Sequence, residues 1–249
     1  MSHELRTPLT SIIGYLELLQ ERGVGELNAQ QHRMLEVINR NTVRLRGLIE
    51  DVMVLSRIEG GVNMAHFVGV SIRALITRVG EELSPFALDH DVELEIDPGP
   101  QVAVVLGEPA SLERAVVNIL SNAIKFSRPG EVVSVRCTLD RDGGRVLITC
   151  QDHGVGIPSQ DLTELFTRFF RASNATDQSI PGTGLGLSIA KQIVEDHHAG
   201  ELRLTSVENE GTTVVIDLPL YEPSQTQPLV GSHPGGNDSY AQDVFGIRA

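Results

Sequence analysis

The chain has 249 residues, of which 41% are hydrophobic and 21% are charged, and no stretch approaches the ~18 consecutive apolar residues of a membrane-spanning helix. Its two cysteines, Cys137 and Cys150, are too few for a disulfide scaffold and lack zinc-ligand spacing, so we expect buried free thiols. Residues 59–220 carry 12 basic and 23 acidic side chains, and because such a surface repels phosphate backbones, we expect no nucleic-acid partner.

The first 58 residues are predicted to form two helices that need helical partners. Apolar residues recur at alternating spacings of three and four over residues 5–19 and again over residues 34–55, which is the seam pattern of helices that pack on other helices. Gly23 and Gly25 separate the two helices, and Asn28 is a candidate N-cap for the second. One such hairpin buries little apolar surface, so two hairpins are expected to pair into a homodimeric four-helix bundle.

The rest of the chain divides into three segments. Residues 59–65 are interpreted as a linker and residues 66–220 as a mixed α and β domain, whereas residues 221–249 are rich in Pro, Gly, Ser, Gln and Asn and are expected to be disordered. Alternating and apolar runs predict strands, and helical periodicity predicts helices. The predicted strands are 92–96, 102–106, 132–139, 145–151, 202–206 and 212–218, and the predicted helices are 108–126 and 185–196.

Two asparagines and a lysine lie close together in the predicted helix 108–126. Asn118 and Asn122 are four residues apart and therefore share a face, with Lys125 within a turn of both. An amide oxygen can coordinate Mg²⁺, and an ammonium group can bind phosphate as a point charge. A set of solvent-exposed polar side chains is the alternative interpretation.

Two glycine-rich segments lie at the ends of predicted elements. Asp152, Gly154 and Gly156 follow a strand directly, where the glycines let the backbone approach a ligand and the carboxylate can accept hydrogen bonds from an amine. The second segment, residues 181–188, runs into a helix, and exposed amides at such a place favour anions such as phosphate. It matches neither the P-loop nor the dinucleotide pattern. Ordinary turns are the alternative interpretation of both segments.

In this order and at these spacings, the three segments resemble the N, G1 and G2 boxes of the two-component sensor histidine kinases. Residues 2–10 resemble the H box of that family, and residues 165–171 resemble its F box. The resemblance covers residues 1 to about 220. It implies an α+β fold class, in which a dimerisation and phosphotransfer hairpin at 1–58 precedes an ATP-binding α/β sandwich of the Bergerat type at 66–220.

The resemblance also implies a role for each matching residue. His3 would be the phosphoacceptor, Glu4 its neighbouring base, and Thr7 would position water for a phosphatase reaction. Among the implied nucleotide-binding residues, Asn118 and Asn122 would hold Mg²⁺, Lys125 would bind the phosphates, and Arg171 would lie near the transferred phosphate. Phe126 would lie beside the base, Asp152 at the adenine amino group, and Gly154 and Gly156 in the pocket wall. The residues around the phosphates, beneath a lid of roughly residues 172–183, would be Gly182, Thr183, Gly184, Leu185 and Gly186.

The sequence departs from the family pattern at three places. His153 stands where the G1 box usually has Asn. A second glycine that the family usually has is absent near His197 and His198, and we expect these two histidines at the surface. His3 lies almost at the first residue. We therefore expect a cytoplasmic fragment whose parent chain has a sensor, with membrane contact only through a missing N-terminal region.

The implied function is ATP-dependent autophosphorylation of His3, followed by phosphotransfer to an aspartate of a response regulator. Two alternatives stay open: a catalytically degenerate dimeric scaffold, and another kinase of the same ATPase superfamily.

Overall fold

The computed structural model describes residues 10–16, 18–19, 25, 27–59, 66–177, 180 and 182–222. The predicted site residues His3, Glu4 and Thr7 lie outside this set, as does the segment 223–249 of the expected disordered tail. No helix among the described residues combines the length and the apolarity that a membrane crossing requires.

The long helix α2, Ala29–Glu59, begins at the predicted cap. The side-chain oxygen of Asn28 accepts hydrogen bonds from the backbone N–H groups of Gln30 and Gln31 at 3.0 and 2.9 Å, and the side chain of Gln31 accepts one from the backbone N–H of Asn28 at 2.8 Å. This reciprocal capping box satisfies N–H groups that the first helical turn leaves without intrahelical partners.

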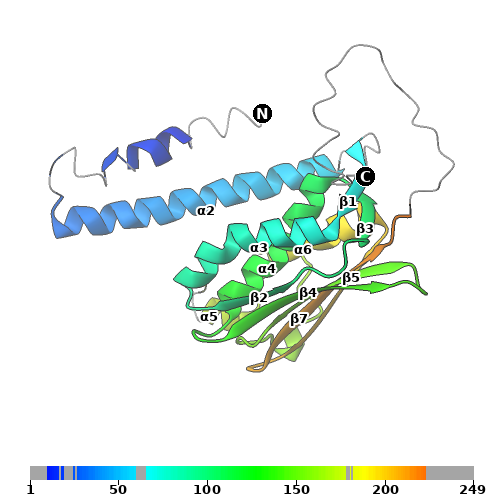
Figure 1. Ribbon diagram of the computed structural model, residues 1–249. Helices are drawn as coiled ribbons and strands as arrows, with labels where there is room; N and C mark the ends of the chain where they lie inside the picture. The colour runs from blue at the N-terminus through cyan, green and yellow to red at the C-terminus, as the bar shows by residue number, and fades with distance from the viewer. Residues whose placement is uncertain are drawn as a thin grey trace, which may run out of the picture.

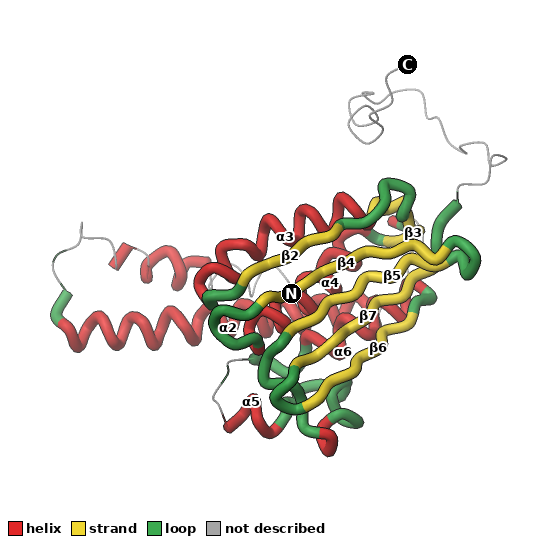
Figure 2. The backbone as a smooth tube through the Cα atoms, turned by 60° about the horizontal axis from the view of Figure 1, so that its bottom comes forward, coloured by secondary structure: helices red, strands yellow, loops and turns green. Residues whose placement is uncertain are grey.

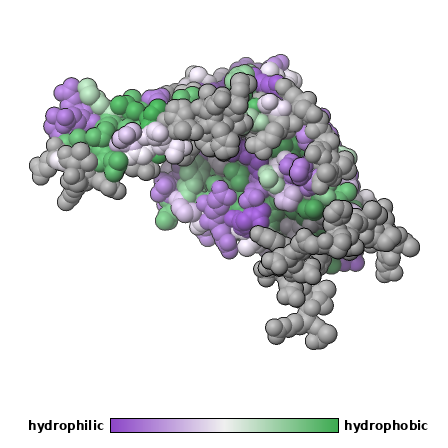
Figure 3. All heavy atoms as spheres, turned by 90° about the horizontal axis from the view of Figure 1, so that it is seen from above, coloured by the Kyte–Doolittle hydropathy of each residue, from purple (hydrophilic) through white to green (hydrophobic). Residues whose placement is uncertain are grey.

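Several apolar side chains along α2 are only about half covered by the described part of the chain. Met34, Ile38, Leu45 and Val52, here called the α2 stripe, are between 47% and 55% exposed and follow the predicted seam spacing. In Figure 1 the N-terminal half of α2 extends beyond the following α/β domain, and the space-filling view shows apolar side chains gathered at that end (Figure 3). Among the described apolar side chains of α2, Leu48, in the C-terminal half of the helix, packs against the core of the following domain.

A five-stranded mixed sheet forms one layer of the following domain (Figure 2). Its strand order is β2 (Glu93–Asp97), β4 (Val132–Asp140), β5 (Arg145–Asp152), β7 (Gly211–Pro219) and β6 (Glu201–Val207). Strands β2 and β4 run parallel, and the other neighbours are antiparallel. A separate antiparallel pair joins β1 (Val68–Ser71) to β3 (Val104–Gly107).

Helices cover one face of this sheet and form the second layer (Figures 1 and 2). They are α3 (Ile72–Asp89), α4 (Pro109–Phe126) and α6 (Gly186–Gln192), which continues as the π-helical segment η4 (Ile193–His197). The short elements η3 (Ser159–Asp161) and α5 (Ser173–Asp177) lie between β5 and α6. One continuous apolar core fills the space between the layers.

The fold agrees with the sequence-based α+β class. All six predicted strands and both predicted helices of this domain are confirmed to within two residues at each end, and Cys137 and Cys150 are buried free thiols as expected. The sequence did not predict β1 or the 18-residue helix α3.

The prediction that His198 is a surface residue is wrong. Its side chain is 5% exposed and its ring stacks on Phe67 with centroids 5.1 Å apart. Nδ1 lies 2.7 Å from the carbonyl oxygen of Ile193, and Nε2 accepts a hydrogen bond from the backbone N–H of Glu108 at 3.2 Å. A ring that donates through Nδ1 and accepts through Nε2 is neutral, and burial lowers the pKa of His198 in agreement with that form.

Candidate functional site

A cavity of about 340 Å³ lies between α4, the sheet and the segment that links β5 to α6. Its volume is in the range of pockets that bind small molecules and cofactors. The cavity brings together residues from all three glycine- or asparagine-containing motifs. The predicted site residues that line it are Asn118, Asn122, Lys125, Phe126, Asp152, Gly156, Arg171, Gly182, Thr183, Gly184 and Gly186. Gly154 and Leu185 lie outside the lining, and Leu185 is fully buried in the core.

Asp152 lines the cavity from the C-terminal end of β5, where it is 6% exposed. One of its oxygens, Oδ1, accepts hydrogen bonds from the backbone N–H groups of Gly154 at 2.9 Å and Thr212 at 3.1 Å. Burial raises the pKa of Asp152, and these two hydrogen bonds oppose the rise. Because the backbone occupies Oδ1, the carboxylate can offer its other oxygen, Oδ2, to a donor in the cavity.

The two glycines after Asp152 allow close contacts that a side chain would prevent. A Cβ atom at Gly154 would lie 2.0 Å from the carbonyl oxygen of Phe126, and one at Gly156 would lie 2.0 Å from that of Val207. Gly156 also has a φ of +59°, which favours glycine. These residues therefore act by fixing the backbone that carries Asp152 and the cavity wall.

The polar face of α4 also lines the cavity. Asn118 is buried, and its Nδ2 donates to the carbonyl oxygen of Gly186 at 3.2 Å, so the alternative of solvent-exposed amides is wrong for this residue. The Lys125 ammonium group lies 4.6 Å from the centroid of the Phe126 ring and directly against Gly182, where a Cβ atom would come within 2.9 Å of Nζ. Burial and then the charge of Arg171 lower the pKa of Lys125 to about 8.

This donor set fits Mg²⁺ and phosphate. The orientation of the Asn118 amide leaves its oxygen free to act as a ligand, and Mg²⁺ is commonly held by one or two protein oxygens together with substrate phosphates. Among the described residues there is no group of three or more His, Cys, Asp or Glu that could hold a metal alone. The amides would therefore hold the ion jointly with phosphate oxygens rather than as a separate metal centre.

Side-chain contacts hold the segment between β5 and α6 in place over the cavity. Asp161 accepts hydrogen bonds from the backbone N–H and the hydroxyl of Ser173 at 2.7 and 2.8 Å, at the start of α5. Asn174 donates to the carbonyl oxygen of Gly156 at 2.9 Å. Arg171, which the sequence places near a transferred phosphate, donates here to the carbonyl oxygens of Ala175 and Ile180. Its guanidinium group thus links the two ends of the segment that contains α5.

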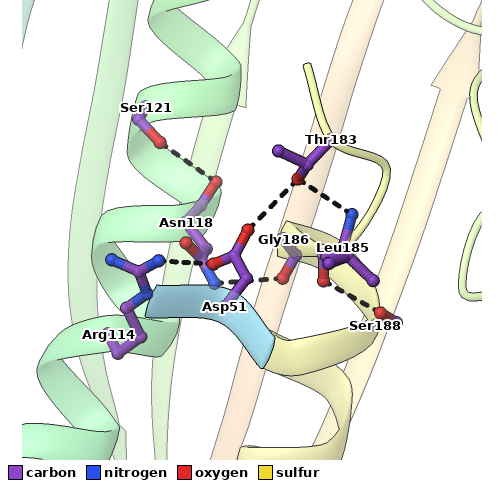
Figure 4. A network of polar contacts seen from close by, with 8 residues as sticks. All are labelled: Asp51, Arg114, Asn118, Ser121, Thr183, Leu185, Gly186 and Ser188. Atoms are coloured by element: carbon purple, nitrogen blue, oxygen red, sulfur yellow. Dashed lines mark hydrogen bonds and ion pairs between the residues drawn. The ribbon is translucent and has the colours of Figure 1, made fainter. Parts of the chain in front are cut away.

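Two charged residues that the sequence did not single out also line the cavity (Figure 4). Asp51 of α2 is 5% exposed and accepts hydrogen bonds from Arg114 Nη2 and, at 3.1 Å, from the Thr183 hydroxyl. Arg114 lies one helical turn before Asn118, so the four-residue spacing that pairs Asn118 with Asn122 extends back to it. Asp51 is 63 and 132 residues from its two partners, and no local pattern in the sequence points to it.

His153, the residue that departs from the G1 pattern, does not belong to the cavity lining. Its side chain is exposed, and Nδ1 lies 3.2 Å from the carbonyl oxygen of Val132. The departure therefore changes a surface contact and leaves the residues around Asp152 in the pattern that the sequence predicts.

Two family models match the chain in its two predicted regions. Residues 107–222 match the model described as histidine kinase-, DNA gyrase B- and HSP90-like ATPase, and residues 1–61 match the His Kinase A (phospho-acceptor) domain. Both matches agree with the resemblance found in the sequence.

Individual proteins give the same result. The chain is 33% identical over 242 residues to the circadian input-output histidine kinase CikA of Synechococcus elongatus, covering 95% of this chain and 32% of that protein. The chain spans about a quarter to a third of the length of the curated relatives that it matches. The crystal structure of full-length ShkA in complex with AMPPNP has a TM-score of 0.67 and 27% identity, covering 88% of this chain and 44% of ShkA. The mycobacterial sensor histidine kinase MprB has a TM-score of 0.53 and 36% identity, covering 61% of this chain and 97% of that chain.

Proposed function

Because the chain belongs to the sensor histidine kinases, we propose that it transfers the γ-phosphate of ATP to His3 and then to an aspartate of a response regulator receiver domain. The observation that carries this proposal is one cavity whose lining contains a buried carboxylate, two amides and an ammonium group. Such a cavity suits a ligand with an amine-bearing base and a polyphosphate, and ATP has both.

The residues that line the cavity have distinct tasks in this proposal. Asp152 accepts a hydrogen bond from the adenine amino group through Oδ2, since Oδ1 is occupied by backbone N–H groups. Lys125 binds the phosphates as a point charge. Asn118 and Asn122 hold Mg²⁺ against the phosphates, where the ion supplies neutralisation of the charge that develops in phosphoryl transfer.

The chemistry at the acceptor follows from the residue types around His3. A neutral imidazole nitrogen is a competent nucleophile near pH 7, and the carboxylate of Glu4 can orient the ring and accept the proton released on phosphorylation. Thr7 is four residues after His3 in the sequence, which is the spacing that puts two side chains on one face of a helix, and in this proposal its hydroxyl positions water for removal of phosphate from the regulator.

The uncovered α2 stripe supports a homodimer. Four large apolar side chains at heptad-like spacing leave an exposed strip along a helix, and pairing with the same strip of a second copy would bury it. We place this region of the protein in the cytoplasm, where response regulators receive phosphate, and any membrane contact in a segment N-terminal to it.

Phosphate labelling tests the proposal directly. With Mg²⁺ and γ-labelled ATP, the chain should acquire label that is stable in alkali and lost in acid, as a phosphoramidate is. His3→Gln should abolish the label and retain nucleotide binding, whereas His32→Gln, which changes an exposed histidine of α2, should leave labelling intact. Persistent label on His3→Gln would move the acceptor to another residue. Nucleotide binding without label in the unaltered chain would favour the degenerate scaffold.

A further inference from the structure

A carboxylate from α2 lines the nucleotide cavity and contacts Thr183, one of the residues assigned to the phosphates. Asp51 lines the cavity together with Lys125 and Gly182, and its side chain is almost fully buried there. In Figure 4 the carboxylate points between α4 and the loop that precedes α6. An acidic side chain is thus placed among groups that the proposed function assigns to an anionic ligand.

The partners of Asp51 are donors that also suit phosphate. Arg114 donates to one carboxylate oxygen through Nη2, and the Thr183 hydroxyl donates to the other at 3.1 Å. Guanidinium groups bind carboxylate and phosphate with the same donor geometry. Arg114 Nε is buried and has no hydrogen-bond partner among the described residues, so this guanidinium retains a donor for a further oxygen.

The contact also fixes α2 against the α/β domain. Leu48 lies three residues before Asp51, on the same helical face, and packs against the apolar core of that domain. The Thr183 hydroxyl in addition accepts a hydrogen bond from the backbone N–H of Leu185 at 3.3 Å, so Asp51 is connected to the loop that leads into α6.

We propose that Asp51 and the phosphates of ATP compete for Arg114 and Thr183, so that docking of α2 and binding of ATP oppose each other. This inference rests on the proposed function, in which the cavity binds ATP. Two anions cannot share one set of donors without repulsion. Phosphate binding therefore expels the carboxylate and frees the C-terminal part of α2. Thermodynamic linkage requires the converse, that docked α2 weakens ATP binding by the same factor.

Nucleotide affinity of the full chain tests the competition. Titration calorimetry compares the unaltered chain with Asp51→Asn, which keeps the shape and removes the charge, and with the matched control Glu36→Gln, which removes a charge from an exposed position of α2. Asp51→Asn should bind ATP at least about five-fold more tightly, with Mg²⁺ and with EDTA, which is the lower end of typical coupling between sites. Glu36→Gln should match the unaltered chain. Adenosine, which lacks phosphates, should bind all three chains equally.

Different results overturn different statements. Equal ATP affinity for Asp51→Asn and the unaltered chain would make the contact purely structural, and an equal gain for adenosine would show that no competition for phosphate exists. Weaker ATP binding by Asp51→Asn only in the presence of Mg²⁺ would make Asp51 a metal ligand instead. Absence of nucleotide binding by every chain would remove the proposed function itself and this inference with it.

A second measurement does not depend on the folding of Asp51→Asn. The chain contains no tryptophan, so Leu48→Trp places a single reporter on the face of α2 that packs against the core. ATP should shift its emission to longer wavelength as α2 leaves the domain, and adenosine should not. Emission that stays constant at saturating ATP would contradict release of α2.

Discussion

The assignment of Asp152 to the adenine amino group predicts a switch of base preference in Asp152→Asn. An asparagine retains one oxygen at the position of Oδ1, where it can accept the backbone hydrogen bonds of Gly154 and Thr212. At the position of Oδ2 it presents an NH₂ group, which is a donor facing the donor of adenine. The variant should therefore stay folded and lose affinity for ATP.

The magnitude follows from the burial of Asp152. The side chain is 6% exposed, so a hydrogen bond to its carboxylate is shielded from water. Hydrogen bonds to charged groups are worth about 1.5–3 kcal/mol, which corresponds to a loss of roughly ten- to hundred-fold in ATP affinity. Inosine triphosphate carries a carbonyl oxygen in place of the amine, and this acceptor matches the new NH₂ group. Its affinity should rise in the variant relative to the unaltered chain.

Asp152→Ala is the matched comparison for stability. It removes the acceptor of two buried N–H groups, each of which costs about 1–3 kcal/mol when left without a partner, so its free energy of unfolding should fall below that of Asp152→Asn. Calorimetric titration with the two nucleotides and thermal unfolding give all of these quantities. If Asp152→Asn bound both nucleotides with equally reduced affinity, or unfolded like Asp152→Ala, Oδ2 would not be the atom that recognises the base.

Two further outcomes concern charge and assembly. The pKa of Lys125 is lowered to about 8, and bound phosphate would raise it again, so ATP affinity should fall as pH rises through about 8. Calorimetry in buffers of different ionisation enthalpy measures the accompanying proton uptake. Lys125→Arg stays protonated and should flatten the pH dependence, whereas an unchanged pH profile in this variant would show that Lys125 does not bind phosphate. Ile38→Glu combined with Leu45→Glu puts charges into the α2 stripe, so light scattering should find monomers in place of dimers. Arg40→Glu, at an exposed neighbouring position, should leave the dimer intact. If the double variant stayed dimeric, the interface would lie elsewhere.

The strands were predictable because they bury alternate residues. In β4 and β5 every second side chain is buried over most of the strand, so the period of the sequence is the period of the sheet. Helix α3 has the same kind of regularity, with Leu75, Ile76, Val79 and Leu83 buried, but Gly80 and Pro85 lie within it and lower its helical propensity. Tertiary contact compensates for the glycine, since Gly80 lies against Ile96 of β2 where a Cβ would be 3.1 Å away.

The residues of the cavity divide in the same way. Asn118, Asn122 and Lys125 could be predicted because one helix fixes their relative positions, and Asp152 because a strand end and two glycines mark it. Outside the cavity, the burial of His198 could not be predicted, since it depends on Phe67 and on the N–H of Glu108, which lie far away in the sequence.

Asp51 is the extreme case of a residue that only the fold reveals. In the sequence it is an ordinary acidic residue of a region, residues 1–58, that is neutral overall, and both of its partners belong to the other domain. The motif before α6 predicts donors for an anion and supplies Thr183, and Arg114 adds a donor on α4 that the sequence did not single out; both can bind either phosphate or a carboxylate. Which of the two occupies them depends on where α2 lies. A site for phosphate that also accepts a side chain of the same protein couples the position of that side chain's helix to nucleotide binding, and that coupling cannot be seen in either motif alone.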